Sequence, residues 1–420
     1  MKIVIVNYRY FISGGPERYM FNLKELLEQH GHHIIPFSIR YAKNQKSEYE
    51  KYFVQPLSSE NEVYFRDQSW TIKSFYKTIE RAFYSPEVYK NFVHLINDTK
   101  PDFAIVLHYG RKLSPAVISA LHDTKIPFVV RLSDFGMVCA NSHMLRNEEV
   151  CEICVKGNRF NSVKHKCVQD SLGASLVDYA ASRFQSIAGF NDKVKYYVVP
   201  SRFTRSKMIE AGYDEQKFIH VPTFVKTNGK ISMERKKQIL FVGRIEKTKG
   251  VHVLLDAVKI LQKENNMNFD CILAGFGSED YVNEQKKFIE ENELKNIQFT
   301  GYIEKNKIDE LISESLFTVS PSIWYDNMPN SVLESLALGT PVIASDHGSF
   351  TELIDHEKTG LLFKPGDSND LAEKMKTLLS DTSLSLALGK NAFERASDYH
   401  SGERHYKSLM EIYNRLTGKN

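Results

Sequence analysis

Two acidic residues in the segment between Ser320 and Pro341 have a spacing that could serve the binding of a phosphorylated, hydroxyl-rich ligand. Asp326 is expected in a polar loop after a strand, and Glu334 follows eight positions later, in the first turn of the next helix. N–H groups at the start of a helix lack intrahelical partners and attract anions. Because nearby carboxylates can accept hydrogen bonds from hydroxyls, the combination suits a nucleotide sugar.

The same residues also have a purely structural interpretation. Ser331 and Glu334 have the spacing of a capping box, in which the glutamate bonds the backbone at the helix start. Asp326 beside Asn327 could belong to an ordinary turn. Further residues along the chain favour the ligand-binding interpretation.

Glycines and cations follow other expected strands. Gly14 and Gly15 follow the first strand and open a helix, where the absence of a side chain lets a ligand approach the backbone. Arg244 and Lys249 lie in a Gly-Arg…Lys-Gly loop after a later strand. An arginine can bind phosphate through two N–H groups and a lysine adds a point charge, so this loop is a candidate phosphate site. The glycines do not form a complete Gly-x-Gly-x-x-Gly motif, so dinucleotide binding is not indicated.

Three more strand ends carry candidate site residues. Gly275 could shape a pocket for a base, and Tyr302 with Ile303 could form a wall beside it. Asp134 lies after a strand in the first half of the chain, where it could also be a helix-capping or turn residue. We expect Asp134 to face Glu334 from the opposite side of a cleft.

Short apolar runs alternate with helical patterns along the chain, which predicts parallel sheets covered by helices. The alternation restarts after residue 221, so we expect two doubly wound halves, residues 1–221 and 222–400. Ligands bind beyond the carboxyl ends of the strands in such sheets, and the cleft between the halves is the expected site. A final helix over 401–418 is expected to pack back on the first half, and residues 41–100 are expected to be helical and peripheral.

Composition limits the possible functions. A chain of 420 residues with 42% hydrophobic and 25% charged residues is ordinary for a globular protein of two or three domains. The net charge of +3 is too small to indicate a nucleic-acid partner. No apolar run approaches the roughly 18–20 residues that span a bilayer, so a cytoplasmic location is expected. Residues 156–207 hold ten Lys/Arg against three Asp, which could favour peripheral contact with anionic lipid or could be a solvated face.

Four of the five cysteines fall in one short region, as Cys139, Cys151, Cys154 and Cys167. A Cys-x2-Cys pair with two outer cysteines is consistent with a structural zinc site, with His143 and His165 as possible substitutes. Free thiols and disulfides are the alternatives. Zinc would be the only bound cofactor expected, and its role would be structural.

Taken together, these residues resemble the family-4 retaining glycosyltransferases of GT-B architecture. Gly243-Arg244 with Lys249-Gly250 is similar to the family's diphosphate-binding element, and Asp326-x7-Glu334 is similar to its Glu-x7-Glu motif. The clustered cysteines resemble a cysteine-bearing branch, much of it in cell-surface polysaccharide assembly. The resemblance implies an α/β fold with two Rossmann-like domains facing each other across a cleft, the first binding the acceptor and the second the nucleotide sugar.

The resemblance also implies roles for individual residues. Glu334 would bond the ribose and Asp326 the donor sugar, while Arg244 and Lys249 would offset the diphosphate charge. Phosphate would be cradled by N–H groups of the helix start, at Asn330, Ser331 and Val332. Two positions depart from the family pattern: Asp326 stands where Glu is typical, and Ser133 stands where many members carry His.

The expected reaction is transfer of a sugar with retention of configuration, from a UDP-sugar rather than a GDP-sugar, to a saccharide acceptor that is lipid-linked. No Asp-x-Asp pair occurs in the sequence, so a metal-held diphosphate is not indicated. Two alternatives stay open. One is a nucleotide-sugar epimerase on the same scaffold, and the other is an inactive donor-binding subunit.

Overall fold

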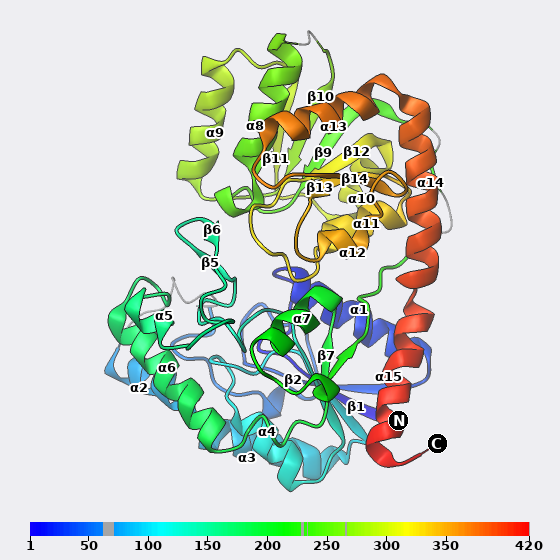
Figure 1. Ribbon diagram of the computed structural model, residues 1–420. Coiled ribbons are helices and arrows are strands. Elements are labelled where there is room, and N and C mark those ends of the chain that lie inside the picture. Colours follow the sequence, from blue (N-terminus) through cyan, green and yellow to red (C-terminus); the bar gives the residue numbers. More distant parts are fainter. Residues whose placement is uncertain (62–70, 228–230, 233, 265–266, 420) are drawn as a thin grey trace.

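The computed structural model describes residues 1–61, 71–227, 231–232, 234–264 and 267–419. Two six-stranded parallel sheets form its centre, in the orders β2-β1-β3-β4-β7-β8 and β11-β10-β9-β12-β13-β14. Helices cover both sheets, and the two halves lie one above the other with the carboxyl ends of their strands toward the interface (Figure 1). The doubly wound fold predicted from the sequence is therefore confirmed.

The first sheet alternates with helices and carries a small β-hairpin as an insertion. Its elements are β1 Lys2–Val6, α1 Gly15–Gln29, β2 His33–Phe37, α2 Ile72–Phe83, α3 Pro86–Thr99, β3 Phe103–Val106, α4 Ala116–Asp123, β4 Phe128–Arg131, β5 Leu145–Arg146, β6 Glu149–Val150, α5 Asn161–Lys164, α6 Leu172–Ile187, β7 Tyr197–Val199, α7 Arg202–Glu210 and β8 Phe218–His220.

The second sheet follows the same alternation and ends in three long helices. Its elements are β9 Lys236–Val242, α8 Val251–Lys259, β10 Asp270–Ala274, α9 Glu279–Glu291, β11 Ile297–Gly301, α10 Lys305–Glu314, β12 Ser315–Ser320, α11 Asn330–Ala337, β13 Val342–Ser345, α12 Phe350–Leu353, β14 Gly360–Phe363, α13 Ser368–Ser380, α14 Thr382–Tyr399 and α15 Gly402–Thr417.

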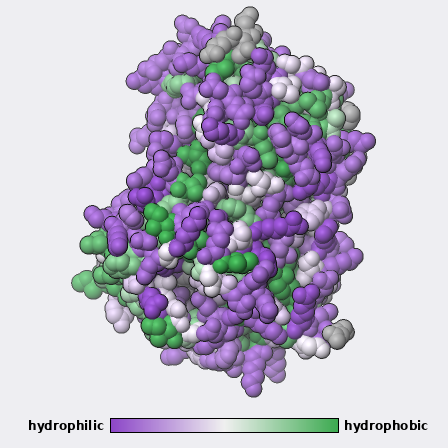
Figure 2. Space-filling model, in the orientation of Figure 1, coloured by the Kyte–Doolittle hydropathy of each residue, from purple (hydrophilic) through white to green (hydrophobic). Residues whose placement is uncertain are grey.

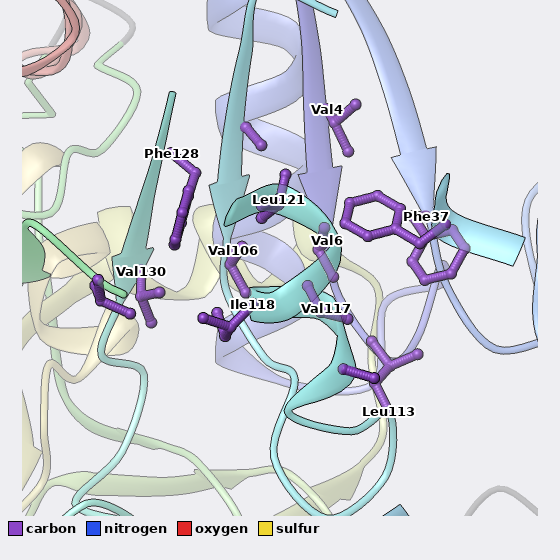
Figure 3. Packing of buried hydrophobic residues seen from close by; sticks show 14 of the residues in the cluster. Val4, Val6, Phe37, Val106, Leu113, Val117, Ile118, Leu121, Phe128 and Val130 are labelled. Carbon is purple, nitrogen blue, oxygen red and sulfur yellow. The ribbon is translucent and has the colours of Figure 1, made fainter. Parts of the chain in front are cut away.

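Strand β1 shows how one apolar run stabilises both faces of a sheet. Successive side chains of a strand point to opposite faces. Val4 and Val6 pack with α3 and α4, as the close view of Val117, Ile118 and Leu121 shows (Figure 3). Ile3 and Ile5 belong instead to the cluster formed with α1 and α15. A near-continuous apolar strand is what a doubly covered parallel sheet requires.

Helix α15 packs on the first half, as the sequence suggested for residues 401–418. Leu409, Ile412 and Tyr413 are buried in the cluster that contains Ile3 and Ile5. Helix α14 packs against α11 in the second half, so the chain crosses between the halves at His400 (Figure 1).

The expectation that residues 41–100 are peripheral is wrong for α3. Phe92 and Leu95 of this helix are fully buried in the core of the first half. Residues 62–70 of this stretch lie outside the described part of the chain. None of the helices in the described residues combines the length and the apolar content that crossing a bilayer requires.

Candidate functional site

Helix α11 presents its start to the first half, and the capping box that was the structural alternative for Ser331 and Glu334 does not form. The helix begins at Asn330 after Pro329, so Glu334 is its fifth residue, beyond the first turn. No side chain caps this start. The Glu334 carboxylate, 8% exposed, instead pairs with Arg18 of α1 at 3.0 Å and lies 3.7 Å from Lys305. Glu334 therefore links the two halves and is not engaged by its own helix.

Lys249 and Asp326 form a second charged pair close to the start of α11. Lys249 donates a hydrogen bond to the Asp326 carboxylate, and both side chains are largely buried. Gly250 follows at a φ of 71°, and a Cβ there would lie 1.8 Å from the Pro321 carbonyl oxygen. Only glycine fits this position, because it lets the loop after β9 pass close to the loop after β12.

The Trp324 ring lies among the cations of the second half. The Lys249 ammonium is 5.0 Å and the Arg244 guanidinium 6.0 Å from the indole centroid. Arg244 is half exposed and pairs with Glu246 at 3.0 Å. Both cations predicted to bind phosphate therefore lie within 6.0 Å of the centre of one aromatic ring.

Hydrogen bonds join the loops predicted to hold a nucleoside. Gly275 donates to the Gly301 carbonyl at 3.1 Å, and Gly243 donates to the Ala274 carbonyl at 3.0 Å. A Cβ on Gly275 would lie 1.8 Å from the Gly243 carbonyl oxygen, so this glycine is needed for the close approach of two loops. Tyr302 comes directly after Gly301 and is 77% exposed, while Ile303 is partly buried against the core.

The first half contributes backbone and acidic groups to the same interface. The Gly15 carbonyl accepts a hydrogen bond from the Asn330 amide at 3.1 Å, and Gly14 precedes it at the start of α1. Asp134 lies 3.3 Å from the His108 imidazole and accepts a bond from the Gly136 N–H at 2.7 Å. Burial raises the pKa of Asp134, but His108, the Gly136 N–H and His143 together lower it further, so its pKa lies below the usual value.

The backbone N–H groups expected to cradle phosphate differ in their present bonding. The Val332 N–H donates to the Pro329 carbonyl at 3.2 Å, and the Val332 side chain is buried in the core. Asn330 and Ser331 stand before it at the open start of the helix. We therefore expect the first two positions of α11 to contribute more to an anion site than Val332.

Several site residues were not identified from the sequence. Arg18 lies one turn into α1, and Lys305 opens α10, yet both approach Glu334. His143, predicted as a substitute zinc ligand, packs its ring 4.6 Å from Trp324. Burial lowers the pKa of His143, with Asp134 opposing this shift and Arg244 and Lys249 adding to it. The sequence signal available for Arg18 was its place just after the glycine pair.

The four clustered cysteines are free thiols and are all partly buried. They lie near enough to interact, since burial and the three other cysteines raise the pKa of Cys154 to about 11. In the described ranges, no three Cys, His, Asp or Glu side chains come together in a way that could hold a metal ion. The zinc site therefore stays a prediction from the spacing of the cysteines.

Comparisons with known proteins point to one family for the second half. Residues 226–395 match the family model "Glycosyl transferases group 1". Spore coat protein SA of Bacillus subtilis is 27% identical over 199 residues, which cover 44% of this chain and 50% of that protein. The capsular polysaccharide biosynthesis glycosyltransferase CapM of Staphylococcus aureus is 23% identical over 337 residues, covering 78% and 86%. The chain spans about half the length of the first curated relatives that it matches.

Solved structures show the same overall fold. Sucrose-phosphate synthase of Thermosynechococcus elongatus superposes with a TM-score of 0.72 at 18% identity, covering all of both chains. HepE of Anabaena in complex with UDP gives a TM-score of 0.66 at 17% identity, covering 99% of this chain and 100% of that one. The chain therefore has a GT-B fold, and its second half is similar to the group 1 glycosyl transferase family model.

Proposed function

We propose that this protein transfers a sugar from a nucleoside diphosphate sugar to a hydroxyl of a saccharide acceptor in polysaccharide biosynthesis. One observation carries the proposal. Arg244, Lys249, Asp326, Glu334 and the open start of α11 meet at one edge of the second sheet, facing the first half. Cations and a helix start suit a diphosphate, and the carboxylates suit the hydroxyls of ribose and sugar.

In the proposed site each charged group has a separate task. Glu334 accepts hydrogen bonds from the ribose, with Gly275, Tyr302 and Ile303 around the base. Arg244 and Lys249 stabilise the diphosphate as it leaves, because fixed positive charge placed where negative charge develops lowers the barrier. Asp326 holds hydroxyls of the donor sugar. Asp134, from the first half, lies on the acceptor side with His108.

The donor must displace existing pairs before it can bind. In the structure Arg18 forms an ion pair with the Glu334 carboxylate, and Lys249 forms one with Asp326. A ribose would replace Arg18 at Glu334, and a diphosphate would take Lys249 as its partner. The diphosphate then balances the charge of Lys249, and the ribose and sugar hydroxyls donate hydrogen bonds to the two freed carboxylates.

We further propose that the reaction retains the sugar configuration, needs no divalent metal, and uses UDP as the nucleotide. The bond between the anomeric carbon and the diphosphate breaks, the acceptor oxygen bonds to the same face, and its proton passes to a phosphate oxygen. The positive side chains and the lack of an Asp-x-Asp pair in the sequence support metal independence. Retention, UDP and a lipid-linked acceptor rest on the family resemblance.

The test is a turnover assay with UDP-, GDP- and ADP-sugars, with and without EDTA, followed by NMR of the product anomer. We expect release of one nucleotide from one class of conjugate, unchanged by EDTA, with the donor configuration kept in the product. A strict requirement for Mg²⁺ or an inverted product would contradict the finer proposal. Binding of a nucleotide without any turnover would favour an inactive donor-binding subunit.

A further inference from the structure

Helix α6 turns a stripe of large apolar side chains toward solvent. Leu172, Leu176, Phe184 and Ile187 are 56%, 51%, 40% and 78% exposed. Residues three or four apart, or multiples of this, lie on one face of a helix. The buried residues of α6, such as Ser175 and Asp178, occupy the opposite face. The apolar stripe of this helix is therefore directed away from the core, the reverse of the usual arrangement.

Helix α2 extends the same apolar surface. Ile72, Phe75 and Tyr76 are 92%, 56% and 71% exposed, and α2 packs against α6. The rings of Phe83 and Phe184 lie 5.7 Å apart, which joins the two helices. Phe160, before α5, is 39% exposed and contacts Tyr179 of α6 at 5.2 Å.

We call this surface the α2–α6 face, formed by Ile72, Phe75, Tyr76, Phe160, Leu172, Leu176, Phe184 and Ile187. Hydrophobic side chains gather at the lower left of the molecule, in the region where Figure 1 shows α5 and α6 (Figure 2). Single exposed apolar residues are normal, but a gathered set marks an interaction surface.

Positive charge accompanies the α2–α6 face. The exposed cations are Lys73 on α2, Lys164 on α5, Lys166 just after α5 and Arg183 on α6. The Lys164 ammonium lies 6.0 Å from the Phe160 ring. Asp178 is buried and bonded to Arg111 and Arg159, at 2.9 and 3.1 Å, while Asp170 is exposed. Cations thus outnumber the exposed carboxylates at the surface.

We propose that the α2–α6 face docks on an anionic phospholipid bilayer. Apolar side chains enter the interface between headgroups and acyl chains, and lysines bind the anionic headgroups. A second copy of the chain is disfavoured as the occupant, because its own face would bring like charges together. Membrane docking is argued from the surface itself. Only its purpose, which is to bring a lipid-linked acceptor to the protein, rests on the proposed function.

The position of this face agrees with that purpose. The β5–β6 hairpin extends from the region of α5 and α6 toward the second half (Figure 1). Glu148 in this hairpin pairs with Lys247, which lies two residues before the site residue Lys249. A bilayer against α2 and α6 would therefore lie beside the interface where donor and acceptor meet.

Vesicle flotation of the full chain tests the proposal. We expect binding to vesicles of phosphatidylcholine with phosphatidylglycerol, no binding to phosphatidylcholine alone, and weakening by added salt. A Leu176→Ser/Ile187→Ser variant should bind at least tenfold more weakly. A Lys164→Glu/Lys166→Glu variant should lose about fivefold or more per residue. Lys390→Glu, on α14 in the second half, is the matched control and should bind like the unmodified chain.

Melting temperature and UDP binding separate this proposal from the proposed function. Both should stay unchanged in the variants, because the altered side chains are exposed and lie outside the donor site. Failure of the unmodified chain to float with anionic vesicles, or flotation unaffected by both double variants, would overturn the docking proposal alone. A dimer seen in sedimentation without lipid, and abolished by Leu176→Ser/Ile187→Ser, would also overturn it. If the unmodified chain floats with anionic vesicles but does not bind UDP, the proposed function is contradicted instead.

Discussion

The second sheet has the strand order β11-β10-β9-β12-β13-β14, in which the chain moves to one side of β9 and then to the other. The first sheet, β2-β1-β3-β4-β7-β8, has the same size but carries a long insertion between β4 and β7. The family model matches only the second half. The comparison teaches that the residues of the proposed donor site lie in short loops of the second half, while the insertion of the first half holds the cysteines and α6, and α2 precedes that insertion.

The strongest test of this division removes one cation from a second-half loop. Replacing Lys249 with Met should lower kcat by about 100- to 1,000-fold, because a charge placed at the leaving diphosphate is lost. The neighbouring Lys247→Met is the matched control, since Lys247 pairs with Glu148 at the surface and should change kcat by less than about fivefold. If a steady-state assay shows that both variants lower kcat equally, Lys249 has no special role, and the contrast drawn between the two halves fails.

Two buried histidines lie where the chain passes between the two halves, and they should make the stability of the fold fall at acidic pH. His405 donates to the Pro222 carbonyl and bonds Tyr19, and His400 donates to the Thr223 carbonyl. Burial lowers the pKa of His405 to about 3 and that of His400 to about 4. The unfolded chain binds protons as pH falls below about 6.5, whereas the folded chain does not. Stability should therefore be full above pH 6.5 and fall toward pH 4, by up to about 1.4 kcal/mol per pH unit for each histidine.

Urea unfolding at a series of pH values measures this effect. A His400→Gln/His405→Gln variant cannot bind these protons, so its stability should depend less on pH. His94→Gln, at a position 69% exposed on α3, should keep the full dependence. If the free energy of unfolding of the double variant depends on pH as strongly as that of the unmodified chain, the loss of stability in acid has another origin.

A contact between the halves at α7 should have a smaller effect. The Glu352 carboxylate of α12 accepts hydrogen bonds from the backbone N–H groups of Arg202 and Phe203, at the start of α7. Glu352→Ala removes this cap and should cost about 1 kcal/mol, or roughly 2–4 °C in Tm. Faster hydrogen exchange at the Arg202 and Phe203 amides should accompany it, and the exposed Glu373→Ala should show neither change.

The smallest expected effect concerns the pair between Arg18 and Glu334. Uridine has a ribose but no phosphate, so it must displace Arg18 without offering that arginine a new partner. Arg18→Ala should therefore tighten uridine binding by about two- to fivefold, the size expected for a partly exposed ion pair. Weaker uridine binding in a calorimetric titration would mean that Arg18 supports the nucleoside and does not compete with it.

Much of the fold could be predicted because long apolar strands and periodic helices carry strong local signals. The strands with the weakest sequence signals are short or lie at sheet edges. β2, His33–Phe37, contains Pro36 and is an edge strand, where proline is tolerated. β8 has only three residues, and β14, Gly360–Phe363, has four and is an edge strand.

The site was predictable to the extent that it follows from strand ends. Asp326, Glu334, Arg244 and Lys249 lie at one edge, as the alternation of strands and helices suggested. The Arg18–Glu334 pair could not be predicted, because its residues lie 316 positions apart and depend on how the two halves meet. The exposure of α6 could not be predicted either, since periodicity shows an apolar stripe but not the direction it faces.

Calorimetric titration of UDP into the unmodified chain, Glu334→Gln and Glu373→Gln tests the central claim most directly. Glu334 meets the first half at the predicted ribose site, whereas Glu373 is an exposed residue of α13. We expect the unmodified chain and Glu373→Gln to bind UDP equally, and Glu334→Gln to bind about tenfold or more weakly, as loss of a charged hydrogen-bond acceptor implies. Equal binding by all three, or no UDP binding by the unmodified chain, would contradict the account.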